Sequence, residues 1–340
     1  MSHSFISRRY EPIVTSSIPI NTLLRNKMGA GCSAGQKTYK HKDAVLSVCA
    51  TLDGKYFATG TSDSTPILWS QEDGTFVTAA SATTYRGFKG HTGRVYSLCM
   101  TLDGKHLITG SNDKTARLWS LDDGTMVREF KGHTEGVLSV CITLDGKHLI
   151  TGSNDDTARL WSLEDGTMIR EFKGHTEGVN SVCVTLDGKH LITGSYDKTA
   201  RLWSLDDGTM VREFKGHTKD LKSVCVTLDG KHLITGSNDK TARLWSLEDG
   251  TMVREFKGHN EGAVSSVCVT LNGKYLITGS DDNTARLWSL EDGTMVREFK
   301  GHKGAVSSVC VTVDGKHLIT GSWDKTARFW LLDVTEGTLE

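Results

Sequence analysis

The chain of 340 residues carries 40 basic and 41 acidic side chains, so its formal net charge is only −1. This balance excludes a strong overall field of the kind that attracts nucleic acid or an anionic membrane surface. No apolar run approaches the roughly 18 residues that a membrane span requires, and the N-terminus lacks the apolar stretch of a secretory signal. We therefore expect a soluble protein of the cytoplasm, with the nucleus or an organelle as alternatives.

The N-terminal segment, residues 1–32, differs in kind from the rest of the chain. It matches no other part of the sequence, and residues 1–31 contain four basic residues, one acidic residue and two of the three prolines. Terminal segments of this composition are commonly mobile, so we expect a disordered tail or a tether to a larger assembly. An organelle transit peptide, which also combines Arg and Ser with few acidic residues, is the alternative.

A segment of about 42 residues then recurs through the rest of the chain, and its second copy reads GHTGRVYSLCMTLDGKHLITGSNDKTARLWSLDDGTMVREFK. The His of its Gly-His pair returns at His91, His133, His175, His217, His259 and His302, and a more divergent first copy starts at His41. A unit of this length has no core of its own and must stack against neighbours to bury its apolar faces. Residues 33–334 are therefore predicted to form one repeat domain, followed by a C-terminal end at 335–340.

Each unit contains four runs of strand character separated by turn signals, which in the second copy are VYSLCMTL, KHLITGS, TARLWSL and TMVREFK. Asp-Gly between two such runs is a strong hairpin signal, because both central residues of a type I′ turn take positive φ. The unit is therefore predicted to be a four-stranded antiparallel meander whose charged fourth strand is an exposed edge.

Four positions recur together in every full copy: a His, a Thr or Ser, an Asp and a Trp. With the Gly-His start and the period of the repeat, they make the chain resemble the WD-repeat family of β-propellers over residues 33–334. The resemblance implies an all-β, seven-bladed propeller and a hydrogen-bonded network inside each blade. The implied network residues are His91, Thr109, Asp113, Trp119, His133, Asp155, Trp161, His175, Asp197, Trp203, His217, Asp239, Trp245, His259, Asp282, Trp288, His302, Asp324 and Trp330.

Two choices remain within this network. Thr109 and Ser111 point to the same face of their strand, and we favour Thr109 as the hydroxyl that bridges to the indole. Trp119 is followed by Ser120, where the family usually has Asp, but that Asp lies outside the network and the fold does not depend on it. The same His, Asp and Thr also resemble a hydrolase triad, yet an active site repeated in every blade would be odd, so we predict a structural role and no enzyme activity.

Cysteine usage points away from metal and disulfide chemistry. Seven cysteines occupy one register of the repeat, and we interpret them as small buried apolar residues. No Cys or His pair has the spacing of a zinc site, so we expect no metal ion and no cofactor. The seven positions are Cys49, Cys99, Cys141, Cys183, Cys225, Cys268 and Cys310.

The two ends of the repeat domain are complementary. The last copy ends soon after Trp330 and lacks the TMVREFK run, whereas Gln36–His41 aligns with the REFKGH of other copies. An N-terminal strand is therefore predicted to complete the last blade and remove the open edge of the ring. The first copy also departs from the pattern, with Pro66 in its third strand and extra residues around FVTAASATTYRG that suggest an extended loop.

Residues that break the repeat are the candidates for partner binding. They fall just before the network Asp and three residues before each Cys, and the resemblance implies that both sets border the mouth of a central channel. We single out Tyr96, Tyr196 and Trp323 as anchors, because such side chains bury a large area at low entropic cost. Charge and further contacts come from Arg94, Lys222, Asp220, Asp281, Leu138 and Asn180.

The resemblance implies a non-catalytic scaffold that binds other proteins or peptides on this top face, the face that carries the turns between second and third strands. We expect no nucleic acid or membrane partner, and a monomeric propeller that acts alone or within a larger complex. Two alternatives stay open. One is a phosphopeptide or anion site built on Arg94 and Lys222, and the other is an enzyme with a single site at the channel mouth.

Overall fold

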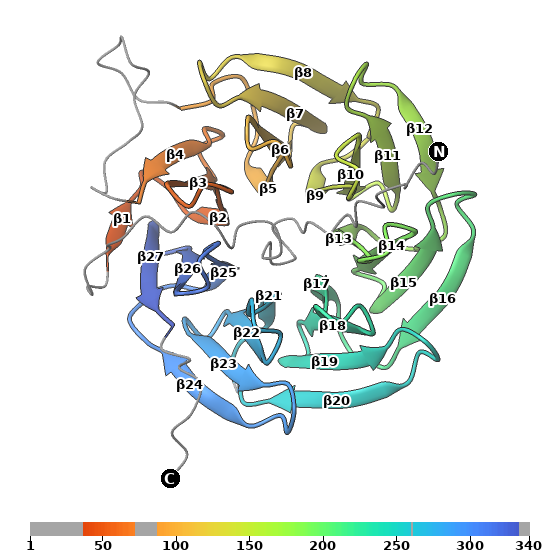
Figure 1. The fold of residues 1–340 in the computed structure, drawn as a ribbon, viewed down its shortest axis with the longest axis vertical. Coiled ribbons are helices and arrows are strands. Elements are labelled where there is room, and N and C mark those ends of the chain that lie inside the picture. The colour runs from red at the N-terminus through yellow and green to blue at the C-terminus, as the bar shows by residue number, and fades with distance from the viewer. Residues whose placement is uncertain (1–36, 72–86, 260, 333–340) are drawn as a thin grey trace, which may run out of the picture.

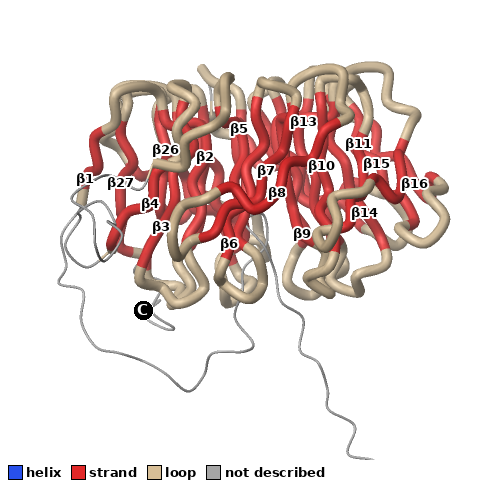
Figure 2. The backbone as a smooth tube through the Cα atoms, turned by 90° about the horizontal axis from the view of Figure 1, so that it is seen from above, coloured by secondary structure: helices blue, strands red, loops and turns tan. Residues whose placement is uncertain are grey.

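The computed structural model describes residues 37–71, 87–259 and 261–332, which form a closed ring of seven blades around a central axis (Figure 1). Strands run across the thickness of the ring, and turns make up its two faces (Figure 2). All elements of the described ranges are β-strands. These ranges therefore contain no helix that could cross a membrane. The prediction of an all-β propeller is confirmed.

Blades 2 to 6 are complete four-stranded antiparallel sheets, ordered from the innermost to the outermost strand as in the sequence. Blade 2 consists of β5 (Val95–Met100), β6 (His106–Ser111), β7 (Thr115–Ser120) and β8 (Met126–Lys131), and blade 3 of β9 (Val137–Ile142), β10 (His148–Ser153), β11 (Ala158–Ser162) and β12 (Met168–Phe172). Blade 4 consists of β13 (Val179–Val184), β14 (His190–Ser195), β15 (Thr199–Ser204) and β16 (Met210–Lys215). Blade 5 consists of β17 (Leu221–Val226), β18 (His232–Ser237), β19 (Thr241–Ser246) and β20 (Met252–Lys257), and blade 6 of β21 (Val264–Val269), β22 (Tyr275–Ser280), β23 (Ala285–Ser289) and β24 (Met295–Phe299).

Blade 7 is completed by the N-terminus. It contains β25 (Val306–Val311), β26 (His317–Ser322) and β27 (Thr326–Leu331), and β1 (Thr38–Lys40) pairs antiparallel with β27 as its outermost strand. The predicted closure is therefore confirmed. Residues 1–32 and 335–340, for which we predicted a tail and a C-terminal end, lie outside the described residues.

Blade 1 is the most irregular blade. Its strands are β2 (Val45–Ala50), β3 (Tyr56–Thr61) and β4 (Ile67–Ser70), and an isolated bridge joins Ile67 to Gly87 at the place of a fourth strand. Pro66 directly precedes β4, so its missing N–H removes no bond from that strand, and its carbonyl accepts the N–H of Phe88 at 3.0 Å. Most of the predicted loop insertion lies in residues 72–86, outside the described residues.

The Asp-Gly hairpins form, but not through the turn type predicted. Gly104 has a φ of 68°, whereas Asp103 is not among the residues with positive φ, which rules out a type I′ turn. Gly104 N–H instead donates to the carbonyl of Thr101 at 2.9 Å, and Asp103 Oδ1 accepts the Thr101 hydroxyl and the N–H of Lys105. The aspartate thus braces a four-residue turn in which only the glycine needs the left-handed region.

The hydrophobic core lies between blades. The cluster between blades 2 and 3 joins Cys99, Ile108 and Phe130 of one blade to Val140 and Trp161 of the next, all of them nearly inaccessible to solvent. Equivalent clusters occur at the other six interfaces. The seven repeat cysteines are buried and free, and burial raises the pKa of the Cys141 thiol, which agrees with an apolar role.

Serine side chains on the innermost strands add a polar link between blades. Ser97 Oγ accepts the backbone N–H of Val140 in the next blade at 3.1 Å, and Ser308 accepts that of Val48 across the closure at 3.1 Å. The sequence pattern did not reveal this role, although Ser recurs two residues before every Cys. Each bond satisfies an inner-strand N–H that faces the neighbouring blade rather than a strand.

Tyr39 holds the closing strand in the core. Only 3% of its surface is exposed, and its ring lies 4.7 Å from Phe57 and 5.3 Å from Trp69 of blade 1, centroid to centroid. We predict that Tyr39→Ala lowers the free energy of unfolding by about 3–5 kcal/mol, the usual cost of truncating a buried aromatic residue. Urea denaturation followed by tryptophan fluorescence measures this change. Lys40→Ala, on the exposed side of the same strand, is the control, and equal effects of the two variants would contradict the closure.

Candidate functional site

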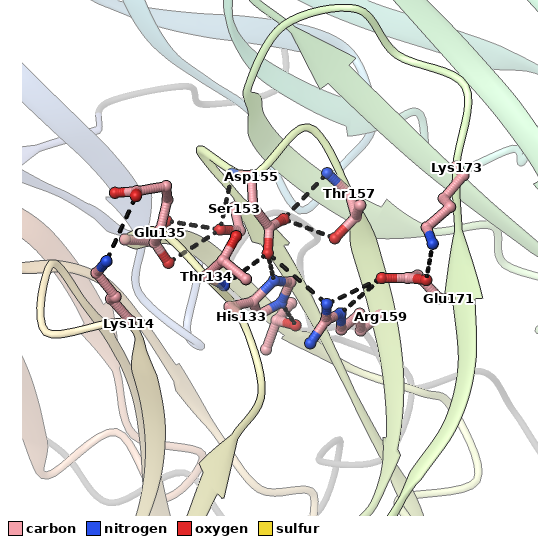
Figure 3. A network of polar contacts seen from close by, with 12 residues as sticks. Lys114, His133, Thr134, Glu135, Ser153, Asp155, Thr157, Arg159, Glu171 and Lys173 are labelled. Atoms are coloured by element: carbon pink, nitrogen blue, oxygen red, sulfur yellow. Dashed lines mark hydrogen bonds and ion pairs between the residues drawn. The ribbon is translucent and has the colours of Figure 1, made fainter.

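The residues that recur in every repeat form a network inside each blade, and Figure 3 shows His133 and Asp155 of the network in blade 3. His133 precedes β9, Thr151 lies on β10 and Trp161 on β11, while Asp155 lies in the turn between β10 and β11. His133 Nδ1 lies 2.7 Å from Asp155 Oδ2, and His133 Nε2 lies 2.7 Å from Thr151 Oγ1. The Trp161 indole N–H donates to the same hydroxyl at 2.8 Å. We call these four residues and their equivalents the blade network.

The blade network has the same geometry in blades 2 to 7, with His-to-Asp distances of 2.6–2.8 Å. The threonine is the bridging hydroxyl in each of them, as in Thr109 of blade 2. The neighbouring serine has a different role, because Ser111 Oγ donates to Gly93 O at 3.0 Å and accepts the N–H of Asp113 at 3.2 Å. It thereby ties the turn of one hairpin to the loop that enters the innermost strand.

The electrostatics of the network are those of a structural element. Burial alone would raise the pKa of Asp113, but hydrogen bonds from His91 and Thr115 outweigh it and hold this pKa well below its usual range. The Asp113 carboxylate is thus ionised and accepts hydrogen bonds within the blade. Thr109 is inaccessible to solvent, and His91 is nearly so. Among the residues that the structure describes, no group of three His, Cys, Asp or Glu side chains is arranged to hold a metal ion. A fully connected polar network of this kind rigidifies the sheet around it.

Blade 1 has an incomplete network. His41 Nε2 lies 2.9 Å from Thr59 Oγ1, which also accepts the Trp69 indole N–H at 3.0 Å. His41 Nδ1, however, is buried without a hydrogen-bond partner. Asp63 Oδ1 instead accepts the hydroxyl of Thr61, which stands where the other blades have serine. Burial lowers the pKa of His41 from 6.5 to about 4, and the backbone at Tyr39, the charge of Asp63 and the backbone at Lys325 oppose this shift only in part.

The recurring third-strand arginine pairs within its own blade rather than with a turn of the next one. Arg117 stays in its own blade, where its guanidinium lies 5.9 Å from the centroid of the Trp119 ring and donates to Glu129 Oε1 at 2.8 Å. The turn of the next blade is contacted by the fourth-strand Arg128, whose Nη2 donates to Glu164 O at 2.6 Å. The register explains this, since Arg117 lies directly opposite Glu129 in the sheet.

The positions three residues before each Cys border a small central cavity of about 110 Å³ at the ring axis. Each of them is the extra residue of a β-bulge on the innermost strand, so that Val95 and Ser97 pair with consecutive residues of β6 while Tyr96 has no partner. Bulges commonly re-aim a side chain in this way. The bulge positions that line the cavity include Leu46, Tyr96, Leu138, Asn180, Lys222 and Ser307.

A contiguous polar cluster forms where blades 4 and 5 meet at this mouth. The Tyr196 hydroxyl donates to Asn180 Oδ1 at 3.1 Å, and Asn180 Nδ2 donates to the carbonyl of Lys222 at 3.0 Å. Lys222 Nζ lies 4.7 Å from the centroid of the Tyr196 ring, within the range of a cation–π interaction. These three residues form the top-face cluster, and the structure brings together partner-binding candidates from both sets of positions.

The charges of two carboxylates act on the lysine of the top-face cluster. Burial lowers the pKa of Lys222, and the charges of Asp220 and Asp281 partly oppose that shift. Asp220 Oδ2 accepts Asn238 Nδ2 at 3.1 Å, and Asp281 Oδ1 accepts the Ser265 hydroxyl at 2.7 Å. The acidic groups outnumber the cation, so this part of the mouth favours a polar or basic group over an anion.

Comparison with protein families decides the classification. The family model for the WD domain, G-beta repeat, matches residues 35–70, 81–120, 124–162, 166–204, 208–246, 250–289 and 293–330. The chain belongs to the WD-repeat family. WD-repeat propellers generally bind other proteins as scaffolds and typically are not catalysts. No curated protein matches the sequence at a significant level.

The other predicted contacts of this WD-repeat propeller divide into exposed and buried residues. Trp323 is 55% exposed and stands in blade 7, and Arg94 is exposed just before β5 of blade 2. Leu138 is 9% exposed and therefore offers little surface to a partner. No hydrogen bond or ion pair between the described residues joins Trp323 or the Arg94 side chain to the top-face cluster.

The rim carries a feature that the sequence pattern did not reveal. We predicted a charged outer edge, but the outermost strands begin with exposed apolar pairs, such as Met126 and Val127, each 47% exposed. A bulge between the third and fourth strands at this point leaves both side chains outside the core. The pairs recur at Met168 and Ile169, Met210 and Val211, Met252 and Val253, and Met295 and Val296.

The blade network yields a prediction for its bridging hydroxyl. Thr151→Val removes the acceptor of the Trp161 indole N–H and the partner of His133 Nε2, so both of these nitrogens become buried without a bond, while His133 Nδ1 keeps Asp155. We expect a loss of about 1–3 kcal/mol in the free energy of unfolding. The control is Thr134→Val in the same blade, since Thr134 is exposed and its N–H bond to Asp155 survives the change. A denaturation midpoint equal to that of the control would show that the hydroxyl is dispensable.

The incomplete network of blade 1 makes stability depend on pH. The folded-state pKa of His41 lies below its ordinary value, so between pH 6.5 and about 4 the unfolded chain binds a proton that the folded chain does not. We therefore predict that stability falls as the pH falls through this window and that His41→Gln shows a smaller fall. Urea midpoints measured from about pH 7 to about pH 4 provide the comparison, with His148→Gln, at the partly exposed first residue of β10, as control. An unchanged slope for His41→Gln would contradict the prediction.

Proposed function

We propose that this WD-repeat propeller is a non-catalytic scaffold that binds a peptide or protein segment on its top face, across the mouth of the channel. The observation that supports the proposal is the top-face cluster, Tyr196, Asn180 and Lys222. It is assembled from positions where the repeat is broken, and the consensus blades have no counterpart of it. Specific recognition by a ring of near-identical blades requires such an asymmetry.

The chemistry of the cluster suggests which segment binds there. The charges of Asp220 and Asp281 act on Lys222, and Tyr196 offers an aromatic surface whose hydroxyl already bonds to Asn180. The two negative charges favour a basic or polar side chain of a partner, while Trp323 on blade 7 offers an exposed apolar contact. A phosphopeptide would meet the same two carboxylates, and this weighs against the alternative built on Arg94 and Lys222.

Affinity capture with the full-length chain tests the proposal. We expect Tyr196→Ala/Trp323→Ala to lose the proteins that the wild-type chain captures, because truncating aromatic anchors commonly costs about 2 kcal/mol or more of binding, roughly 30-fold in affinity. The matched control is Asn112→Ala/Asn154→Ala, which changes the same repeat position in blades 2 and 3.

Each outcome separates the hypotheses. Equal losses in the test and control variants would show that the aromatic positions are not special. An unchanged set of captured proteins in both would place the interaction elsewhere. Arg94→Glu addresses the phosphopeptide alternative, which predicts a selective loss of phosphorylated proteins, whereas the scaffold proposal predicts no such selectivity.

A further inference from the structure

Five blades carry the same arrangement of three charges on their outer strands. In blade 2, Glu129 Oε1 accepts Arg117 Nη2 at 2.8 Å, and Lys131 Nζ lies 2.6 Å from Glu129 Oε2. We call this arrangement the charge triad, and Figure 3 shows its blade 3 version, Arg159, Glu171 and Lys173. Blades 4 to 6 repeat it as Arg201–Glu213–Lys215, Arg243–Glu255–Lys257 and Arg286–Glu298–Lys300.

Blade 7 has both cations of the triad but not its carboxylate. Arg328 takes the position of Arg117, and a Cβ added to Gly301 would lie 2.6 Å from Arg328 Nη1, just as one added to Gly90 would lie 2.6 Å from Arg117 Nη1. The outer strand here is β1, in which Thr38 lies opposite Arg328 and Lys40 opposite Thr326. In blade 2 the corresponding pairs are Glu129 with Arg117 and Lys131 with Thr115. Thr38 therefore occupies the place of the glutamate.

Within the part of the chain that the structure describes, the charge of Arg328 has no carboxylate counter-ion across the strands. No ion pair joins Arg328 to a carboxylate among the described residues, whereas its equivalent in blade 6, Arg286, pairs with Glu298 at 2.9 Å. Burial lowers the pKa of His302, the hydrogen bond and charge of Asp324 oppose this shift, and the charge of Arg328 adds to it. Thr38 itself is exposed, on an edge strand of only three residues.

We propose that Thr38 is a phosphorylation site whose phosphate completes the charge triad of blade 7 and fastens β1 to β27. A protein kinase would transfer the γ-phosphoryl group of a nucleoside triphosphate. A bond forms between Thr38 Oγ1 and phosphorus, the bond to the β-phosphate oxygen breaks, the hydroxyl proton passes to the kinase, and a nucleoside diphosphate leaves. Lys37 and Lys40 flank the site, which suits a kinase that prefers basic segments.

The phosphate matches the missing group in reach and in charge. From Cβ, the terminal oxygens of phosphothreonine are separated by the same number of bonds as the carboxylate oxygens of glutamate. The group carries about −1.5 to −2 charges at neutral pH and pairs with arginine through two parallel hydrogen bonds. It would thus bind Arg328 across the strands and Lys40 along its own strand, as Glu129 binds Arg117 and Lys131.

Reciprocal substitutions test whether the vacancy is real. Thr38→Glu supplies the carboxylate in blade 7, and Glu129→Thr creates the same vacancy in blade 2. With Thr38→Glu we expect amide hydrogen exchange of β1 to slow by about tenfold, in line with one charge-assisted hydrogen bond. The effect should vanish in an Arg328→Gln background and weaken in high salt, while Glu129→Thr should speed exchange in β8. Equal slowing with and without Arg328 would overturn the proposal.

Direct phosphorylation tests the site itself. The full-length protein is incubated with ATP and a panel of Ser/Thr kinases that prefer basic segments, and phosphate is mapped by mass spectrometry, with Thr38→Val as control. We expect phosphate on Thr38 and the same roughly tenfold slowing of exchange in β1. The proposal is wrong if a peptide of residues 33–44 is modified at Thr38 while the folded chain is not. It is also wrong if phosphorylated Thr38 leaves exchange in β1 unchanged.

Discussion

The structure depends on one constraint, which is that a single blade cannot bury its own apolar faces. Each cluster of core residues is shared by two blades, as where Cys99, Ile108 and Phe130 meet Val140 and Trp161. A linear stack would leave two such faces exposed at its ends. A ring buries these two faces only if the first and last blades pack against each other. The contact of Tyr39 with Phe57 and Trp69 is therefore part of the core between blade 7 and blade 1.

The blade network serves the same constraint from inside each sheet. The indole of Trp161 faces the core shared with blade 2, and its N–H is satisfied by Thr151 of its own blade. His133 and Asp155 then fix that hydroxyl and the adjoining turn. The residues most prominent in the sequence therefore build the scaffold, and the positions that break the repeat remain for recognition.

The sequence predicted the fold, the closure and the bridging threonine because each leaves a periodic signal. It did not predict the turn at Asp103 and Gly104, since several turn types use Asp-Gly, nor the partner of Arg117, which depends on strand register. It placed Tyr196, Asn180 and Lys222 near the mouth, but their mutual contacts depend on bulges at Asn180 and Lys222 that no local pattern reveals. Such a pairing of side chains is set by backbone geometry rather than by composition.

The central claim is that recurring residues build the ring and deviating residues bind its partner. The most direct test replaces three deviating residues by asparagine in the triple variant Tyr196→Asn/Asp281→Asn/Trp323→Asn. Asparagine is the residue that other blades have at this repeat position, as Asn112, Asn154 and Asn238. Affinity for the partner captured by the wild-type chain is then measured beside the urea midpoint. We predict an unchanged midpoint with binding lost, whereas retained binding, or binding lost only together with stability, would contradict the claim.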